Sequence, residues 1–270
     1  MQRVSQLKTN PVSKVLKKGY INLYSQLSPS EMRAIHYKEK YKSEHQDWDE
    51  TQVLLSNEFR KHFDARGTTI LDAGCGNGNF IVDENRDIID WACGVDLKPD
   101  YTHKNVCLDE VKFASLAAIP YPDNTFDAAL SLWVFEHLED PLPVLREINR
   151  VLKPGGLFFF ATPNKNFFPL LLNRFITKSK LTEAILQKIY GRKPEDVFKA
   201  YYKANSLPRL KQLAQETGFD IKKLVYNYDP SYTSFNRLTY TLSSKLAAFL
   251  ESRKCYLNSA HIVGIFKKRN

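Results

Sequence analysis

The sequence has no long hydrophobic run. None of its 270 residues lies in an apolar stretch of the roughly 18 residues that a membrane-spanning helix needs. The first residues, MQRVSQLKTNPVSKVLKKGY, carry positive charges with no apolar segment after them, so we expect no secretory signal. These absences predict a cytoplasmic protein, and peripheral contact with a membrane stays open as an alternative.

Cysteine is scarce, and no group of residues has the spacing of a metal site. The four cysteines show neither metal-ligand pairing nor a disulfide framework, so we expect them to be reduced. They are Cys75, Cys93, Cys107 and Cys255. No cluster of His, Asp and Glu has metal-ligand spacing either, and no metal is predicted. Internal repeats and low-complexity segments are also absent, and the length of 270 residues suits one large domain or a core with additions.

The net charge of +9 is distributed unevenly along the chain. Residues 1–66 carry +4, residues 67–162 carry −8 and residues 163–270 carry +13. A strongly basic C-terminal part favours an acidic partner. A solvated, lysine-rich surface explains the same pattern equally well, so the charge alone does not decide between these interpretations.

From residue 68 onward, short apolar runs alternate with amphipathic segments. The runs are typical of buried parallel strands, and the segments between them predict helices. The predicted strands are TTILDAG, WACGVDL, TFDAALSLW, LFFFATP, DIKKLVYNYD and HIVGIFKK. The predicted helices are NFIVDENRD, PLPVLREINRVLKPGG and SLPRLKQLAQETGF. Strands that alternate with helices predict an α/β fold with a mostly parallel sheet.

The same pattern suggests how the chain is organised. Residues 1–66 are polar and helix-like, so we expect an N-terminal helical extension or lid before a domain over 67–270. Two insertions, at about 163–205 and 231–257, interrupt the alternation. Both leave from carboxyl ends of strands, where the ligand crevice of an open α/β sheet lies. We therefore expect helical caps over the ligand site.

The segment LDAGCGNGNF at residues 71–80 suggests a cofactor site. Gly74, Gly76 and Gly78 are spaced G-x-G-x-G, which differs from the pyrophosphate-binding pattern G-x-G-x-x-G. Asp72 would repel a pyrophosphate but suits a cofactor with positive groups, such as the ammonium and sulfonium of S-adenosylmethionine. Asp96, 20 residues beyond Gly76 at the end of the second strand, can accept ribose hydroxyl protons. Together these residues predict a cationic nucleoside cofactor.

Four segments together resemble the successive motifs of class I S-adenosylmethionine-dependent methyltransferases. They are ILDAGCGNG, GVDL, IPYPDNTFDAALSLWVFEHLEDP and REINRVLKPGGLFFFATPN, within residues 67–164. The most similar subset contains the small-molecule and lipid methyltransferases of ubiquinone and menaquinone biosynthesis. The resemblance implies a Rossmann-like fold whose seven-stranded, mostly parallel sheet carries helices on both faces. It also implies S-adenosylmethionine as the cofactor.

The resemblance assigns residues to this cofactor. Around its methionine portion it places Asp72, Gly74, Cys75, Gly76 and Gly78. Asp96 then takes the ribose hydroxyls, and Leu97 lies beside the adenine. Ser115, followed by Leu116, stands where relatives often carry an acidic residue that contacts the adenine amino group. Trp133 ends the strand that faces the sulfonium, and it is either a wall of the site or part of the core.

His137 in WVFEHLEDP is the candidate catalytic residue. Methyl transfer needs mainly an aligned acceptor, and a hydroxyl acceptor also benefits from a base that removes its proton. Imidazole titrates in the useful pH range, and this histidine follows the strand that ends at the predicted methyl group. A structural hydrogen bond to the loop is the alternative. Glu136 and Asp140 are interpreted as helix-start residues.

These motifs do not specify the acceptor. SLWVFEH stands where enzymes that methylate exocyclic amines of nucleic-acid bases carry an Asn-Pro-Pro-Tyr-like stretch, which argues against that class. The insertions place apolar residues beside basic ones, as in NFFPLLLNRFITKSK. Phe235, Leu238, Leu242, Leu246 and Phe249 have helical spacing, and the simplest interpretation is a cap whose apolar face packs on the core. A basic, membrane-facing surface that admits a lipid and a site for an anionic sugar are alternatives.

We therefore predict an enzyme that methylates oxygen of a small-molecule, lipid-linked or glycan-type acceptor. An RNA methyltransferase is the alternative enzyme, although no RNA-binding module is recognisable and nucleic acid is not the expected partner. If the protein is not an enzyme, the alternative is a scaffold that binds S-adenosylmethionine without catalysing methyl transfer. Further candidates are His45 and Trp48 for a lid, and Tyr20, Tyr24, Tyr201 and Tyr202 for a pocket.

Overall fold

The computed structural model describes residues 28–270 except 100–101, 103–104, 106 and 172–198. The chain divides into two units. The sheet unit comprises residues 51–165, 199–227 and 261–270, and the helical unit comprises residues 1–50, 166–198 and 228–260. The predicted domain boundary at residue 67 stays a prediction.

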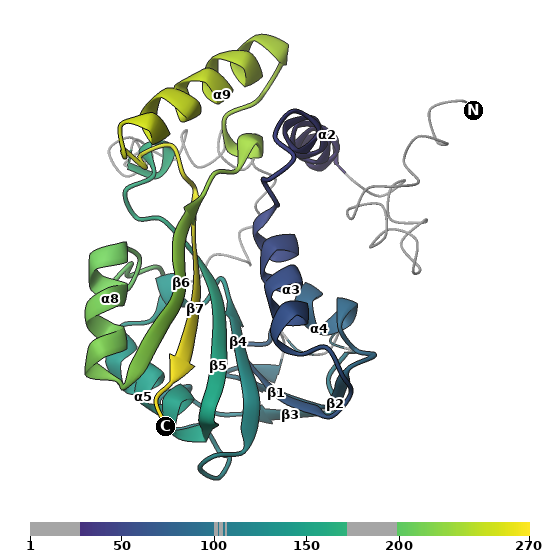
Figure 1. Ribbon diagram of the computed structural model, residues 1–270, viewed down its shortest axis with the longest axis vertical. Coiled ribbons are helices and arrows are strands. Elements are labelled where there is room, and N and C mark those ends of the chain that lie inside the picture. Colours follow the sequence, from purple (N-terminus) through teal and green to yellow (C-terminus); the bar gives the residue numbers. More distant parts are fainter. Residues whose placement is uncertain (1–27, 100–101, 103–104, 106, 172–198) are drawn as a thin grey trace. The chain divides into compact units, whose positions relative to one another are not determined.

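Seven strands form the sheet, in the order β3-β2-β1-β4-β5-β7-β6 (Figure 1). They are β1 (Thr68–Ala73), β2 (Ile89–Asp96), β3 (Glu110–Phe113), β4 (Phe126–Leu132), β5 (Leu152–Pro163), β6 (Phe219–Asn227) and β7 (His261–Lys268). β7 is antiparallel to its neighbours β5 and β6, whereas the other neighbouring strands pair in parallel. The predicted α/β fold with a mostly parallel, seven-stranded sheet is confirmed.

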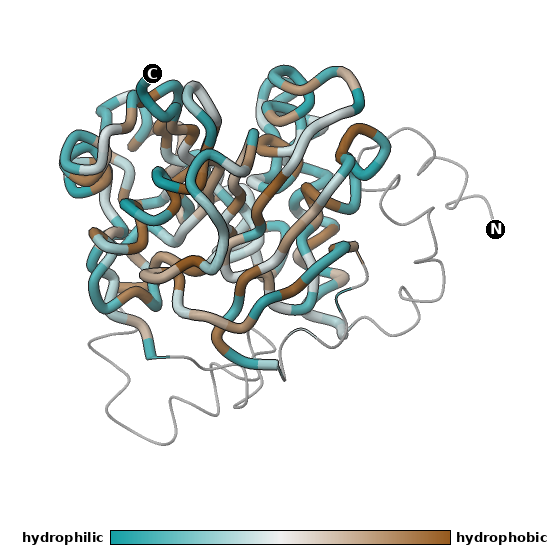
Figure 2. The backbone as a smooth tube through the Cα atoms, turned by 90° about the horizontal axis from the view of Figure 1, so that it is seen from below, coloured by the Kyte–Doolittle hydropathy of each residue, from teal (hydrophilic) through white to brown (hydrophobic). Residues whose placement is uncertain are grey.

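Helices cover both faces of this sheet (Figure 1). α3 (Thr51–His62) and α4 (Phe80–Glu84) lie on one face, and α5 (Pro141–Val151) and α8 (Leu207–Glu216) lie on the other. Side chains alternate along β1, so Ile70 belongs to the core with α3 and Leu71 to the core with α5. Along the backbone, hydrophobic stretches are separated by hydrophilic ones (Figure 2).

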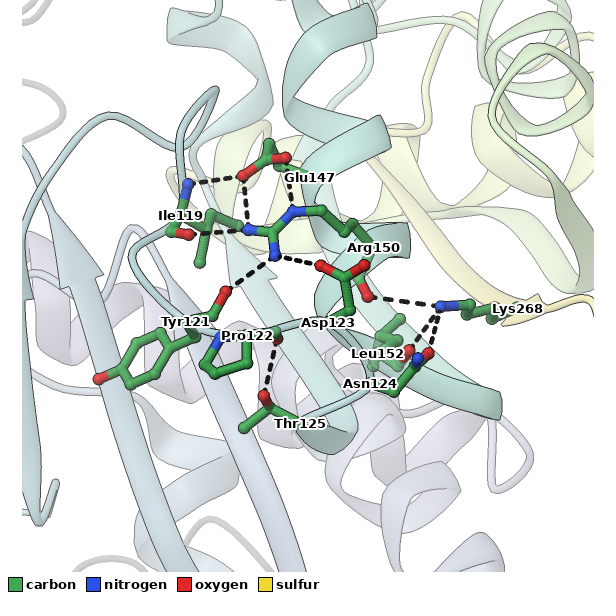
Figure 3. A network of polar contacts seen from close by, with 10 residues as sticks. All are labelled: Ile119, Tyr121, Pro122, Asp123, Asn124, Thr125, Glu147, Arg150, Leu152 and Lys268. Atoms are coloured by element: carbon green, nitrogen blue, oxygen red, sulfur yellow. Dashed lines mark hydrogen bonds and ion pairs between the residues drawn. The ribbon is translucent and has the colours of Figure 1, made fainter.

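Arg150 of α5 fixes the loop that leads from β3 into β4. Its guanidinium donates to the backbone oxygens of Ile119 and Tyr121, both at 2.8 Å, and to the Asp123 carboxylate at 2.7 Å. Glu147 accepts two more bonds from Arg150 at 2.8 Å and also binds the Ile119 amide (Figure 3). A planar guanidinium has five donor hydrogens, and all five find acceptors here.

The carboxyl ends of β5 and β6 and the start of β7 share one edge of the sheet, and each lies close in sequence to a boundary between the two units. β5 and β6 reach this edge at Pro163 and Asn227, and β7 leaves it at His261, which pairs with both. Thr51, the first residue of α3, hydrogen-bonds to His261, and Lys199 accepts a bond from the turn after β4. Since β1, β2 and β4 run parallel to β5, their carboxyl ends share this edge. The predicted position of the insertions over the ligand site stays a prediction.

The helical unit is held together by aromatic residues from distant parts of the chain. Its main helices are α2 (Pro29–Glu44) and α9 (Arg237–Ser252), and the short helix η6 (Pro230–Tyr232) precedes α9. The aromatic cluster consists of Tyr37, Tyr41, Tyr228 and Tyr240, with Trp48 packed against it. Beside it, Lys38 forms ion pairs with Glu50 at 2.5 Å and with the buried Asp229 at 3.3 Å.

The apolar side of α9 corrects one expectation from the sequence. Leu238, Leu242, Leu246 and Phe249 have the predicted helical spacing, but they are exposed rather than packed on a core. The residues that α9 buries are smaller or more polar: Tyr240, Ser243 and Ala247. Tyr240 donates to Glu44 of α2, and Ser243 shares a hydrogen bond with Tyr228, so polar contacts fix this face of α9.

Replacing Arg150 with alanine should destabilise the sheet unit. We expect the free energy of unfolding to fall by about 2 kcal/mol, because charged hydrogen bonds to two carboxylates and two carbonyls are lost together. Arg209→Ala is the matched control, since both arginine side chains are 31% exposed but Arg209 makes one ion pair at 3.9 Å. The control should cost less than about 0.5 kcal/mol. Urea unfolding measures both, and equal losses would contradict the role given to Arg150.

Candidate active site

The glycine turn follows β1 and lies against the turn after β4. Gly74 has φ +82°, and a Cβ there would lie 2.4 Å from Cγ2 of Val134. Its amide donates to the Val95 carbonyl of β2 at 2.8 Å. Gly76 has φ +44°, and a Cβ added there would meet no atom within 4 Å. The turn thus needs glycine at both positions, and bare backbone borders open space at Gly76.

Asp72 lies beneath this turn and is 1% exposed. Its Oδ1 accepts a hydrogen bond from the Asn79 side chain at 2.9 Å, and Asn79 in turn caps the start of α4. Its Oδ2 is buried and has no hydrogen-bond partner among the described residues. Burial raises the pKa of Asp72 to about 7, and the neighbouring charges of Asp96 and Asp83 add to this shift. A cationic group that reached Oδ2 would satisfy this oxygen and favour the ionised carboxylate.

Asp96 ties the end of β2 to the glycine turn. Its Oδ2 accepts from the Gly76 amide at 2.9 Å, and its Oδ1 accepts from the Leu97 amide at 2.7 Å. Asn105 donates to the Gly76 carbonyl at 3.2 Å from the other side. A carboxylate has about four lone-pair directions, so Asp96 can accept further protons from a ligand.

The other predicted cofactor residues divide into exposed and buried ones. Leu97 is 71% exposed and follows Asp96, which suits an apolar surface beside a base. Ser115 is exposed, and its hydroxyl accepts from the Ala117 amide at 3.2 Å. Leu116 is buried in the core that contains α5. Cys75 is also buried, and burial raises the pKa of its thiol, so packing is its observed role.

Trp133 stands in a strained backbone conformation at the end of β4. Its φ is +60°, which is unusual for a large side chain, and its amide bonds to Ala161 of β5 at 3.0 Å. The indole packs edge-on against the imidazole of His261, with ring centroids 4.6 Å apart. His261 is buried and its Nδ1 lies 3.0 Å from the Thr51 hydroxyl. Sequence reasoning did not select His261, because β7 joins this edge only through its antiparallel pairing with β5.

His137 closes the short helix η4 (Phe135–His137) directly after β4. Its Nδ1 lies 3.0 Å from the carbonyl oxygen of Lys199. A carbonyl can only accept, so Nδ1 carries the hydrogen and Nε2 is the basic nitrogen of the neutral ring. Nε2 lies 3.9 Å from Oε1 of Glu136.

Glu136 lies in the short helix η4, as expected, and both its side chain and its backbone also form hydrogen bonds to other segments. The residue is 7% exposed, and its Oε2 accepts from the Thr162 hydroxyl at 3.2 Å. The backbone oxygen of Glu136 accepts from the amides of Tyr201 and Tyr202, at 2.7 and 3.1 Å. Asp140 does cap a helix, because its side chain accepts from the Leu142 amide at the start of α5. The local contacts thus fix a carboxylate beside the imidazole.

The remaining candidates belong to the helical unit or fall outside the described residues. His45 stacks on Tyr41 with ring centroids 4.0 Å apart, and the Trp48 indole donates to the Tyr228 carbonyl at 2.9 Å, both within the helical unit. Tyr20 and Tyr24 lie outside the described residues, as does most of the basic segment after Leu171.

Comparisons with known proteins find methyltransferases that match the part of the chain containing the glycine turn. Residues 71–160 match the Methyltransf_11 family, described as a methyltransferase domain. A protein of Mycolicibacterium smegmatis named as an S-adenosylmethionine-dependent methyltransferase is 33% identical over 153 residues, which are 51% of this chain and 57% of that protein. A demethylmenaquinone methyltransferase of Staphylococcus aureus is 25% identical over 165 residues, which are 57% of this chain and 68% of that one. The chain thus spans little more than half of the first relative's length.

A solved structure shares the fold. A chain from the complex between the Haloferax volcanii Trm112 methyltransferase activator and a methyltransferase aligns with a TM-score of 0.55. The alignment covers 88% of this chain and 94% of that chain at 17% sequence identity. Because the identity is low, this likeness shows the fold alone. S-adenosylmethionine is the cofactor of such domains, and the unpartnered Asp72 oxygen beside the open glycine turn fits its positive groups.

Asp96→Ala should weaken binding of S-adenosylmethionine. Losing the bonds to the Gly76 and Leu97 amides frees the turn, and charged hydrogen bonds of this kind contribute about 1.5–3 kcal/mol each. We expect at least about a tenfold loss of affinity by calorimetry. Asp90→Ala is the control, since Asp90 lies on the same strand and its carboxylate forms its ion pair with the exposed Arg66, far from the glycine turn along the strand. Normal affinity in Asp96→Ala would show that the cofactor does not use this end of β2.

The affinity for S-adenosylhomocysteine, which keeps the ammonium group, should decrease as the pH is lowered, because Asp72 becomes protonated. In the free protein its pKa is about 7, and a bound cation favours the ionised form. Affinity is therefore full above the raised pKa and is lost as the carboxyl becomes protonated below it, by about tenfold between pH 8 and pH 6. Calorimetry over this range should also show proton release at pH 6. Asp72→Asn removes this dependence, so an identical pH profile in that variant would contradict the assignment.

Proposed function

We propose that this chain, whose residues 71–160 match a methyltransferase domain, is a class I S-adenosylmethionine-dependent methyltransferase that methylates a hydroxyl oxygen of a small, lipid-linked or glycan-type acceptor. The observation that carries this proposal is the His137–Glu136 pair at the carboxyl end of β4. Asp72 and the glycine turn lie at the carboxyl end of β1, which pairs directly with β4. An imidazole and a buried carboxyl group thus lie at neighbouring strand ends, which supports their proposed roles as base and cation-binding group.

The residues present have distinct roles toward the cofactor. When bound, S-adenosylmethionine supplies an electrophilic methyl group. The sulfonium sulfur keeps the electron pair of the carbon–sulfur bond that breaks. Asp72 would hold the ammonium through Oδ2, and Asp96 would accept from the ribose hydroxyls. Leu97 would border the adenine, with Ser115 near its amino group. The bare backbone at Gly76 allows close approach.

His137 would act as the base toward the acceptor. Its Nε2 takes the proton that the acceptor hydroxyl loses as the oxygen forms its bond to carbon. The ring then carries a positive charge, and the Glu136 carboxylate 3.9 Å away compensates that charge. The hydrogen bond from Nδ1 to the Lys199 carbonyl orients the ring and leaves Nε2 as the nitrogen that accepts the proton. Trp133, beside His261, would form a wall of the acceptor site.

Two observations support a lipid-linked acceptor within this class. One relative is named for its action on demethylmenaquinone. The helical unit also exposes large apolar side chains next to basic ones, which is typical of surfaces that contact membranes peripherally. The oxygen acceptor is supported separately by the histidine base, because methyl transfer to an already nucleophilic atom does not require one.

The acceptor class can be tested with methyl-labelled S-adenosylmethionine and a cell extract. After incubation with the protein, the extract is separated into organic-soluble, polysaccharide, RNA and small-molecule fractions. We expect enzyme-dependent label in the organic-soluble, polysaccharide or small-molecule fraction, bound as an ether or ester. Label confined to RNA would overturn the acceptor class, and no transfer into any fraction would favour a non-catalytic scaffold.

The same assay tests the base. His137→Ala should lower turnover by roughly 10²–10⁴-fold and leave cofactor affinity nearly unchanged. Glu136→Gln should lower turnover less and alter the pH dependence of the rate. His62→Ala is the matched control, because its Nδ1 bonds to the Glu58 carbonyl at 2.9 Å on the surface of α3. An unchanged rate in His137→Ala would remove it as the base.

A further inference from the structure

The helix α9 turns its large apolar side chains outward. Leu238, Leu242, Leu246 and Phe249 are 67%, 60%, 50% and 56% exposed. Their spacing of four, four and three residues places them on one stripe of the helix. A helix whose only role is to pack on a protein core turns such residues inward. α9 therefore has two separate faces, one fixed by polar contacts and one apolar and exposed.

Exposed apolar surface is concentrated in the helical unit. Nine of the thirteen exposed large hydrophobic residues in the described chain belong to it, although it supplies the smaller part of the described residues. Phe235, just before the N-cap of α9, is 41% exposed as well, and the Arg33 guanidinium lies 5.4 Å from its ring. Single exposed hydrophobic residues need no explanation, but a continuous stripe marks a contact surface.

Basic side chains accompany the stripe. Arg237, Lys245, Arg253 and Lys254 are exposed, and Lys245 lies between Leu242 and Phe249 along the helix. Residues 228–260 contain two acidic residues, Asp229 and Glu251. Asp229 is buried and paired with Lys38, so Glu251 is the one acidic side chain exposed in this stretch. The exposed charge that residues 228–260 themselves contribute is thus strongly positive.

We propose that this α9 face docks on the surface of a membrane that contains anionic lipids. Leucine and phenylalanine would enter the boundary between headgroups and acyl chains, while the lysine and arginine side chains reach the negatively charged headgroups. Among the described residues no helix has the length and hydropathy to span a bilayer, and docking at the surface requires none. The lipid-linked acceptor rests on the proposed function, but the docking does not.

Vesicle sedimentation of the full chain tests this surface. One set of vesicles consists of phosphatidylcholine alone, and the other of equal parts phosphatidylcholine and phosphatidylglycerol. The protein should bind the anionic vesicles at least about tenfold more tightly, because both apolar burial and headgroup attraction contribute there. The double variant Leu242→Ser/Leu246→Ser should lose most of that binding, and Lys245→Glu should lose the preference for anionic vesicles.

Ile221→Ser/Val225→Ser is the matched control, since it removes two exposed apolar side chains of β6 in the sheet unit. It should bind vesicles like the unchanged protein. Gel filtration of both double variants shows whether α9 instead joins two copies of the chain. No vesicle binding, equal binding by the α9 variant, or a dimer that the α9 variant dissociates would each overturn the proposal.

The measurement is made without methyl donor, so it is independent of catalysis. The α9 variants should keep normal affinity for S-adenosylhomocysteine, which shows that the sheet unit is folded. If vesicle binding fails while methyl transfer succeeds, the docking surface is wrong and the proposed function stands. If the protein binds vesicles but transfers no methyl group, the docking surface stands and the proposed function is wrong.

Discussion

Parallel pairing of the strands determines where the polar groups of this protein gather. Because β1, β2, β4 and β5 run in one direction, the residues that follow them meet at one edge. Asp72 and the glycine turn, Asp96, Trp133 and His137 all come from these strand ends. The antiparallel β7 adds His261 from its first residue. One constraint on strand direction thus brings together residues that are up to almost 190 positions apart in the sequence.

The same edge contains groups that are unfavourable for stability alone. Asp72 is a buried carboxyl group, one of whose oxygens has no hydrogen-bond partner in the described part of the chain, and Glu136 is a buried carboxylate beside a histidine. Trp133 adds a backbone conformation that costs about 1–3 kcal/mol. Such departures from good packing concentrate where a ligand must be recognised. At the loop before β4, by contrast, every donor of Arg150 is satisfied, so that segment is fixed while the site keeps polar atoms for its ligands.

Much of the sheet could be predicted from the sequence because buried strands leave apolar runs and helices leave a different period. The glycine turn and Asp96 were also readable, since their spacing carries the chemistry directly. β3 was missed because its four residues are partly exposed at the sheet's edge and leave no apolar run. The sequence predicts that the first part of β5 belongs to the preceding helix, because the residues Lys153–Gly156 are typical of a helix end. The outward face of α9 could not be predicted either, since periodicity gives a stripe but not its direction.

The aromatic cluster of the helical unit joins the two ends of the described chain. Tyr240 reaches Glu44 across 196 residues, and Trp48 reaches the Tyr228 carbonyl across 180. During synthesis α2 therefore leaves the ribosome long before the segment that holds it exists. Until residues 228–247 are made, its tyrosines lack Tyr228 and Tyr240, and Lys38 lacks Asp229. Contacts of such long range form slowly and late. The strands before β6 can pair in the meantime, so translation order places completion of the helical unit near the end of folding.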